Sequence, residues 1–285
     1  MRSIKNIHKA EYRPIDNLVT YSPLPTQSLQ QIDPFLFLNH HGPQHFDPGN
    51  SGLPFGPHPH RGMETVTFII EGDIVHIDSE GHKSTITAGG IQWMTAGRGL
   101  LHSEVSSETF KKNGGDLEIL QLWVNLPAHL KMTDPNYIGL QKDDIPHITE
   151  DNGNITVDIV SGSWKDQHAN IETVTDVNLS TLYFKPDAHL EMQVPTNHNI
   201  FCYIIRGNFT INNTTVEQMQ LIEFDDDDKN LIFDADNEGI ILFGHAEPFN
   251  ESVVAGGPFV MNTKEEIHQA YQDFYDGKFG TWEDQ

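Results

Sequence analysis

The stretch TVTFIIEGDIVHID, residues 65–78, has a counterpart 135 positions further on in IFCYIIRGNFTINN, residues 200–213. Each stretch has an apolar run, a charged residue, a glycine (Gly72 or Gly207) and then alternating apolar and polar positions. Alternation with a period of two is typical of a half-buried β-strand, and a glycine between two strand-like runs is typical of a turn. The two stretches therefore predict the same pair of strands twice in one chain.

The similarity continues beyond both glycines. TITAGGIQWM (85–94) begins 13 positions after the first glycine, and TVEQMQLIEF (215–224) begins 8 positions after the second. Further strand-like runs are DLEILQLWVNLP at 116–127 and, in the second half, VDIVSG, STLYFKP and GIILFGHAEP. Self-similarity of this kind indicates two related β units in tandem, and short, regularly spaced strands favour a sandwich or closed barrel. We predict an all-β protein.

The segment between the two halves carries Pro135 and Pro146, which are typical of a linker. We predict an N-terminal unit over residues 1–134, a linker over 135–146 and a C-terminal unit over 147–285. Near the end, Thr263 and Glu266 have capping-box spacing and precede apolar residues at helical spacing. A short helix that ends at Gly277 and packs back across one barrel is expected there.

Composition restricts the function classes. The 17 basic and 41 acidic side chains give a net charge of −24, which repels nucleic acid and anionic lipid headgroups. The start of the chain lacks the apolar core of a signal peptide, and no run approaches the ~18 apolar residues of a membrane helix. We expect a cytoplasmic protein that binds neither nucleic acid directly nor membranes. Its single cysteine, Cys202, lies in an apolar run and is expected to be a buried thiol.

Two short motifs carry candidate metal ligands. GPHPHRGMETV (56–66) places His58 and His60 two residues apart, and TAGRGLLHSEV (95–105) places His102 and Glu104 two apart. Residues two apart on a strand point to the same face, so each pair can direct its ligands to one point. If the two strands are neighbours, three imidazoles and a carboxylate converge into a transition-metal site with open positions. The alternative is a set of buried histidines that donate to backbone carbonyls.

The remaining histidines and acidic residues carry no assigned role. His40, His41, His45 and His76 are expected to be hydrogen-bonded or surface residues, although they are close enough in sequence to line the same barrel. The run Asp225–Asp228 is expected to form a solvated turn.

The motifs GPHPHRGMETVTFIIEGDIVHIDSEG, IQWMTAGRGLLHSE and GGPFVMNTKEEI resemble those of the pirin family in the cupin superfamily, and the resemblance covers almost the whole chain. It implies a bicupin: two tandem jelly-roll barrels, with one metal in the N-terminal barrel and a C-terminal segment that folds back. The family's ligands correspond to His58, His60, His102 and Glu104. Met63 stands where members often carry Phe, a departure that affects the pocket wall.

The resemblance also implies the identity of the metal ion and the role of one residue outside the ligand set. Fe(II) is the expected ion, with Mn, Ni, Co, Cu and Zn as alternatives that imidazole ligands also suit. Glu64 fits the glutamate of the general cupin pattern, and many cupins ligate through that residue. Pirins bind the ion through the residue that matches Glu104. We therefore expect Glu64 to accept a hydrogen bond from the N–H of a histidine ligand, on the ring nitrogen that does not bind the ion.

Two functions follow from the resemblance. The first is a dioxygenase like the pirin-type quercetinases, which open a flavonol ring with O2 and release CO, with Glu104 accepting the flavonol proton. The second is a metal-binding regulatory protein, a transcription cofactor that acts through contacts with a protein partner. Three histidines and one glutamate with open positions form a reactive site, which favours the enzyme.

Overall fold

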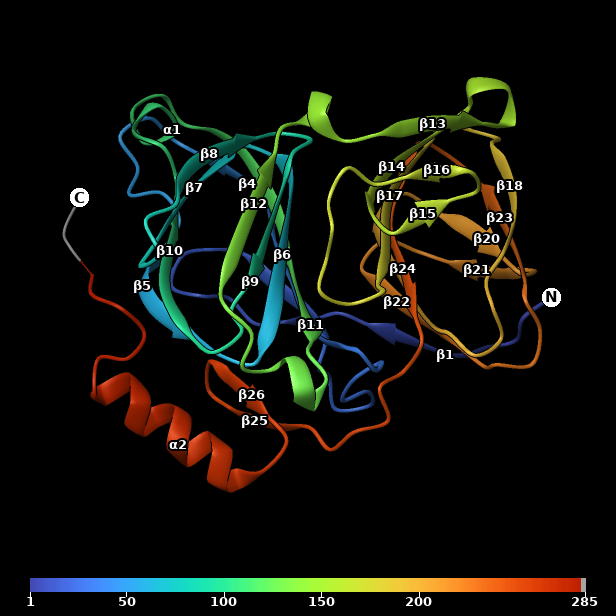
Figure 1. Ribbon diagram of the computed structural model, residues 1–285. Helices are drawn as coiled ribbons and strands as arrows, with labels where there is room; N and C mark the ends of the chain where they lie inside the picture. Colours follow the sequence, from blue (N-terminus) through green and yellow to red (C-terminus); the bar gives the residue numbers. More distant parts are fainter. Residues whose placement is uncertain (283–285) are drawn as a thin grey trace. The chain divides into compact units, whose positions relative to one another are not determined.

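The computed structural model describes residues 1–282, so the last three residues of the predicted C-terminal unit lie outside it. The described chain consists mainly of β-strands, which confirms the predicted all-β class (Figure 1). It divides into two compact units. We call residues 12–21, 37–143 and 249–282 the N-terminal barrel, and residues 1–11, 22–36 and 144–248 the C-terminal barrel.

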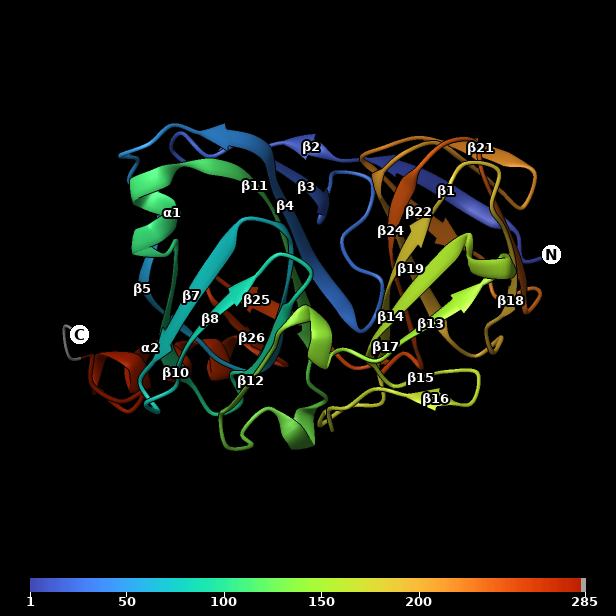
Figure 2. The same cartoon turned by 90° about the horizontal axis from the view of Figure 1, so that it is seen from above.

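The N-terminal barrel is built from two antiparallel sheets (Figure 2). The larger has the order β12 (Asn136–Leu140), β9 (Ile91–Thr95), β6 (Met63–Glu71), β11 (Gly115–Asn125), β4 (Phe35–Phe46), β3 (Thr20–Leu24), β2 (Glu11–Tyr12). The smaller has the order β5 (Phe55–His60), β10 (Leu100–Val105), β7 (Asp73–Asp78), β8 (Lys83–Thr87). The hairpin of β25 (Val254–Gly256) and β26 (Phe259–Met261) and the helices α1 (Glu108–Asn113) and α2 (Lys264–Tyr275) complete this barrel.

The C-terminal barrel repeats this arrangement. Its larger sheet has the order β1 (Ile4–Lys9), β22 (Gln220–Phe224), β19 (Asn199–Arg206), β24 (Gly239–Ala246), β17 (Asn178–Phe184), β14 (Ile155–Ser161), β13 (His147–Glu150). Its smaller sheet has the order β18 (His189–Gln193), β23 (Asn230–Ala235), β20 (Phe209–Ile211), β21 (Thr214–Val216). A separate short hairpin joins β15 (Ser163–Trp164) to β16 (Gln167–His168).

The repeat predicted from sequence is present in the structure. Strands β6 and β7 are separated by Gly72 at φ 89°, and β19 and β20 are separated by Gly207 at φ 91°. A positive φ of this size favours glycine, which explains why both halves carry one at the same point. In each barrel the strand before the glycine belongs to the larger sheet and the strand after it to the smaller sheet.

The chain ends depart from the simple tandem division. Residues 1–11, which the sequence suggested as part of the N-terminal unit, belong to the C-terminal barrel, where β1 pairs with the edge of β22. Residues 249–282, which were predicted for the C-terminal unit, belong to the N-terminal barrel. Of the passages between the barrels, the one at residues 143 and 144 lies inside the predicted linker 135–146. That segment is not a plain linker, because β12 pairs with β9. Edge pairing between distant segments leaves no signal in a local sequence pattern.

The predicted tail helix is confirmed as α2. Thr263 is its N-cap, and Thr263 and Glu266 form both bonds of the capping box. Gly277 follows the helix at φ 74°. The six-residue helix α1 was not expected.

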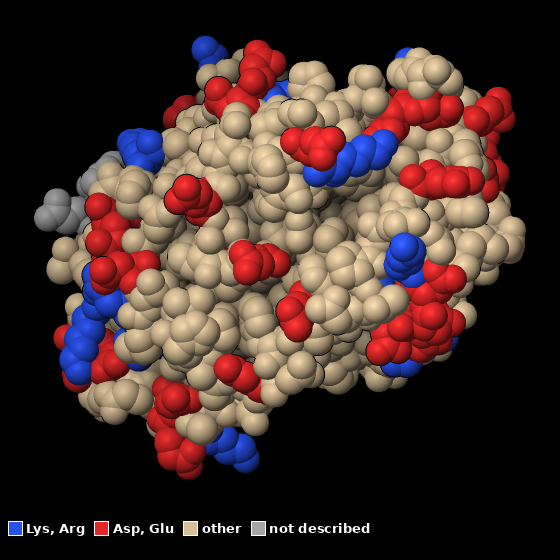
Figure 3. Space-filling model, turned by 45° about the vertical axis from the view of Figure 1, so that its right-hand side comes forward, with Lys and Arg blue, Asp and Glu red and all other residues tan. Residues whose placement is uncertain are grey.

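The interior of the C-terminal barrel is apolar. Twenty-one apolar side chains, including Leu190, Phe233 and the buried Cys202, fill the C-terminal barrel. The Asp225–Asp228 run is exposed or half-buried, in agreement with the expected solvated turn, and it also binds the start of the chain: Asp228 pairs with the N-terminal amine at 2.9 Å, and Asp227 accepts from the Ser3 backbone N–H. Figure 3 shows acidic side chains spread over one face with few basic ones among them. Among residues 1–282, no helix has the length and apolar character to span a membrane.

Candidate metal centre

Strand pairing brings the two histidine motifs together. β5 and β10 are antiparallel neighbours, and their register places His58 directly opposite His102. A shift in the register between His102 and Glu104 sets Glu104 opposite Phe55. The predicted adjacency of the two strands is thus present, and it directs His58, His60 and His102 into the interior of the N-terminal barrel.

The three imidazoles form a compact group. Ring centroids lie 4.3 Å apart for His58 and His102, 4.9 Å for His58 and His60, and 5.0 Å for His60 and His102. One nitrogen from each ring lies within 4.8 Å of the other two. This spacing suits three ligands of one transition ion.

Hydrogen bonds set the orientation of two of these rings. His58 Nδ1 donates to the Gly56 carbonyl at 2.8 Å, and His60 Nδ1 donates to the Pro258 carbonyl at 3.1 Å. A proton on Nδ1 leaves the Nε2 lone pair available for a metal ion. Among residues 1–282, the buried His60 Nε2 and both nitrogens of His102 have no hydrogen-bond partner. Buried polar atoms are rarely left in that state, so the group fits a bound divalent transition ion.

Burial also keeps the imidazoles of His60 and His102 neutral. Burial first and the neighbouring His58 second lower the pKa of His60 to about 3, although the bond to Pro258 opposes the shift. For His102, burial and then the nearby His60, His58 and His76 hold the pKa well below its ordinary value. Neutral imidazole is the form that binds metal ions, so both side chains are ready to act as ligands.

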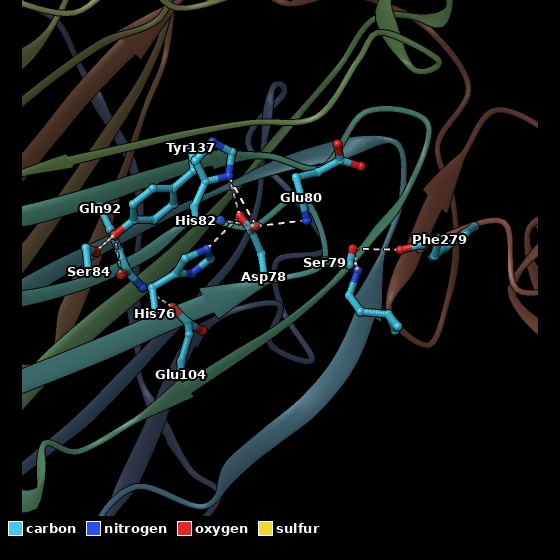
Figure 4. A network of polar contacts seen from close by, with 11 residues as sticks. His76, Asp78, Ser79, Glu80, His82, Ser84, Gln92, Glu104, Tyr137 and Phe279 are labelled. Atoms are coloured by element: carbon cyan, nitrogen blue, oxygen red, sulfur yellow. Dashed lines mark hydrogen bonds and ion pairs between the residues drawn. The ribbon is translucent and has the colours of Figure 1, made fainter. Parts of the chain in front are cut away.

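Glu104 lies in the same cavity but outside the three-nitrogen group. Its carboxylate accepts from Thr67 Oγ1 at 3.1 Å, from Gln121 Nε2 at 2.5 Å and from Gln92 Nε2. Gln92 is in turn bonded to Tyr137, as Figure 4 shows. Three side-chain donors orient the carboxylate, and its predicted role as a fourth ligand stays a prediction.

Glu64 is fully buried on β6. Its Oε1 accepts from Trp93 Nε1 at 2.9 Å and from Thr95 Oγ1 at 2.7 Å. These bonds fix the carboxylate among β6 and β9 side chains. The predicted contact with an outer imidazole N–H stays a prediction.

A cavity of about 260 Å³ opens onto the histidines. Its wall is partly aromatic, and Phe37 and Trp123 stack with ring centroids 4.5 Å apart. Within residues 1–282 its lining is Phe37, Asn39, His41, Phe55, His58, His60, Glu104, Gln121, Trp123, Gly257 and Pro258. The volume is close to the lower end of the ~300–1,000 Å³ typical of small-molecule sites, and the lining suits a flat aromatic ligand.

The C-terminal segment forms one wall of this cavity. It supplies Gly257 and Pro258 to the lining, and Pro258 bonds to His60. Just beyond them, the Val260 N–H donates to the Arg61 carbonyl at 3.0 Å. The buried Lys131 ammonium donates to the carbonyls of Gly62 and Val260. Gly62 has φ 80°, and a Cβ there would lie 2.0 Å from the Val260 oxygen, so only glycine permits this approach.

Sequence reasoning missed several residues of the site. Gln121 and Trp123 alternate on β11 and face the cavity, and this alternation is a signal that could have identified them. His41, to which no role was assigned, also lines the cavity. Pro258 gave no signal, because its contribution is a backbone carbonyl 198 positions from His60.

Acid is expected to destabilise the metal-free protein. Burial lowers the pKa of His41 and of His60 to about 3 and that of His245 to about 4. The unfolded chain therefore binds more protons than the folded chain between these values and ~6.5, so the free energy of unfolding falls as pH drops through that window. Each group contributes up to ~1.4 kcal/mol per pH unit. Urea unfolding at pH 7 and pH 5 should show lower stability at pH 5; equal stability would contradict the buried, neutral assignment.

Known proteins resemble the chain along its whole length. The family models for Pirin and for the Pirin C-terminal cupin domain match residues 17–124 and 179–280. A Pseudomonas aeruginosa protein named "Putative quercetin 2,3-dioxygenase" is 36% identical over 93% of this chain and 92% of its own. Pirin-like protein 2 of Arabidopsis thaliana is 34% identical over 97% of this chain and 85% of its own.

A solved structure agrees with these matches. The crystal structure of quercetin 2,3-dioxygenase from Acinetobacter baumannii superimposes with a TM-score of 0.92, at 33% identity and over 99% of both chains. The repeated barrels, the histidine group of the N-terminal barrel and these relatives lead to one assignment: the chain belongs to the pirin family of bicupins.

Proposed function

We propose that the protein is a metal-dependent dioxygenase that opens the heterocyclic ring of a flavonol with O2 and releases CO. The main support is the group of three imidazoles, of which His60 and His102 are buried and carry unpaired nitrogens, beside an aromatic cavity that also holds a carboxylate. One flavonol and one O2 give one ring-opened ester and one CO, so both oxygen atoms of O2 remain in the ester. The names of the Pseudomonas aeruginosa relative and of the Acinetobacter baumannii structure point to the same reaction class.

His58, His60 and His102 would hold the ion, with Glu104 as the proposed fourth ligand. A bound divalent ion acts as a Lewis acid, which lowers the pKa of a flavonol 3-hydroxyl. Fe(II) is the ion we propose, with Mn, Ni, Co, Cu and Zn as alternatives.

The protein's own residues perform the remaining tasks. Phe37, Phe55 and Trp123 provide apolar surface for the rings of the substrate and limit the access of water. Glu104 accepts the proton of the 3-hydroxyl, which leaves the substrate as an electron-rich anion that can react with O2. Thr67, Gln92 and Gln121 keep the accepting carboxylate in place.

The test is direct. Metal-loaded protein is mixed with quercetin in air, and flavonol absorbance and CO are measured together. Loss of the flavonol band with an equal amount of CO supports the dioxygenase. Loss of the band without CO, or no change, contradicts it.

A second candidate function is a metal-dependent regulatory protein with a protein partner. The observation that favours it is the bond from His60 to Pro258, which connects the histidine group to a segment that continues into α2. Metal occupancy could then alter that segment. Protein that shows no turnover of flavonols, but binds a partner only when loaded with metal, would support this function.

One metal equivalent per chain is the expected stoichiometry. In the C-terminal barrel, β18 and β23 occupy the positions of β5 and β10, but the buried side chains there include Leu190 and Phe233. His189 is exposed and pairs with Asp234 and Glu191. Metal analysis after dialysis should give one equivalent, and two retained equivalents would contradict the assignment.

A further inference from the structure

Two of the three candidate ligands have a hydrogen-bond acceptor for the ring N–H that would not face the ion. Within the described chain, the third ligand, His102, has no such acceptor. His58 donates to Gly56 and His60 to Pro258, while His102 has no partner among residues 1–282 at either nitrogen. A histidine that binds a metal ion through one nitrogen carries a proton on the other, and that N–H requires an acceptor in a buried site. The fully buried His102 therefore needs a neighbour with a free lone pair.

His76 is such a neighbour. The ladder between β10 and β7 places His102 opposite Asp78, so His76 lies diagonally from His102 on the same face. The two ring centroids are 5.4 Å apart. Within the described chain, His76 Nδ1 is also buried and without a hydrogen-bond partner. Unpaired ring nitrogens thus lie on both of these adjacent buried imidazoles.

The other side of His76 determines which tautomer it adopts. Its Nε2 lies 3.0 Å from Asp78 Oδ2, and an ionised carboxylate only accepts, so Nε2 carries the proton and Nδ1 keeps its lone pair. Tyr137 stacks on the ring at a centroid distance of 3.9 Å and an angle of 10°, which fixes the plane of the imidazole. Figure 4 shows Asp78 between His76 and His82, with Tyr137 beside them.

We propose that His76 is a positioning residue for the metal site: its Nδ1 accepts the ring N–H of His102 when the other nitrogen of His102 binds the ion, and Asp78 maintains the accepting tautomer. This inference rests on the proposed metal centre. It assigns a role to a histidine, an aspartate and a tyrosine outside the cavity lining.

Three variants distinguish the role of His76 as a hydrogen-bond acceptor from its packing against Tyr137. His76→Phe keeps a ring that can stack on Tyr137 but has no acceptor, whereas His76→Asn loses the stacking and keeps an oxygen near the position of Nδ1. Asp78→Asn retains the shape of Asp78 and presents an N–H to His76 Nε2, which moves the His76 proton to Nδ1. The matched control is His82→Gln, because His82 also bonds to Asp78 but from the solvent side.

Co(II) is the probe, with its affinity measured by competition with a chelator and its d–d absorption recorded for each protein. We expect His76→Phe and Asp78→Asn to bind Co(II) ~10–100-fold more weakly and to shift the d–d bands. His76→Asn should recover most of the wild-type affinity, and His82→Gln should match wild type. Thermal unfolding of the metal-free variants checks that the barrel is intact.

The outcomes distinguish this inference from the proposed metal centre. If wild-type protein binds no Co(II), the metal centre fails and this inference fails with it. If wild type binds Co(II) and His76→Phe binds equally well with unchanged bands, only the role of His76 is refuted. Equal weakening in His76→Phe and His76→Asn, or in Asp78→Asn and His82→Gln, would assign the effect to packing and also overturn the inference.

Discussion

Glu104→Gln is expected to lower flavonol turnover by ~10²–10⁴ even at saturating metal, the usual cost of losing a general base. Gln keeps the shape of Glu and an oxygen donor, but it cannot accept the proton of the 3-hydroxyl. With a divalent ion and three neutral imidazoles, the substitution also changes the charge of the site from +1 to +2. Metal affinity should therefore weaken moderately while turnover falls much further. The measurement is the turnover rate of the variant as metal concentration is raised to saturation.

A ligand-only role for Glu104 predicts a different result. In that case excess metal would restore most of the rate, and near-wild-type turnover at full occupancy would refute the assignment as a base. Glu118→Gln is the matched control, because Glu118 is another fully buried carboxylate of the N-terminal barrel, bonded to His40 and outside the cavity lining. Its turnover should remain close to that of wild type.

His60→Ala is expected to empty the metal site while the barrel stays folded. The substitution removes one of the three nitrogens proposed to bind the ion. Metal affinity should therefore fall by more than the ~10–100-fold that follows when a ligand only loses its hydrogen-bond partner. The cavity left beside Trp123 should cost ~0.5–3 kcal/mol of stability, which the apolar clusters of the barrel can sustain. Metal content after dialysis and chemical unfolding of the metal-free protein measure the two effects separately.

His189→Ala provides the comparison for His60. It removes an exposed histidine from β18, the strand of the C-terminal barrel that corresponds to β5. Its metal content should equal that of wild type. A His60→Ala protein that retains one equivalent, or a His189→Ala protein that loses it, would exclude the proposed ligand set.

The parts of the site that the sequence predicted are those that obey strand periodicity. His58 with His60, and His102 with Glu104, are two residues apart, so each pair shares a face whatever the rest of the chain does. The duplicated glycines Gly72 and Gly207 similarly identified the repeat. A local pattern of this kind determines which residues share a strand face in any fold that contains the strand.

The parts that were missed depend on contacts between distant segments. β1 joins the edge of β22 more than 200 positions away, and no local pattern in residues 4–9 specifies that partner. Pro258 contributes only a carbonyl, which every residue type possesses. The donors to Glu104 come from β6, β9 and β11, and their convergence follows from sheet order, which the sequence did not supply.

The bond between His60 and Pro258 has a consequence for biosynthesis. The two residues are separated by 198 positions, so at ~5–20 residues per second the Pro258 carbonyl leaves the ribosome ~10–40 s after His60. Until then the His60 ring lacks its orienting acceptor and the cavity lacks one wall. Stable capture of the ion is consequently one of the last events of maturation, although all its proposed ligands are translated in the first half of the chain.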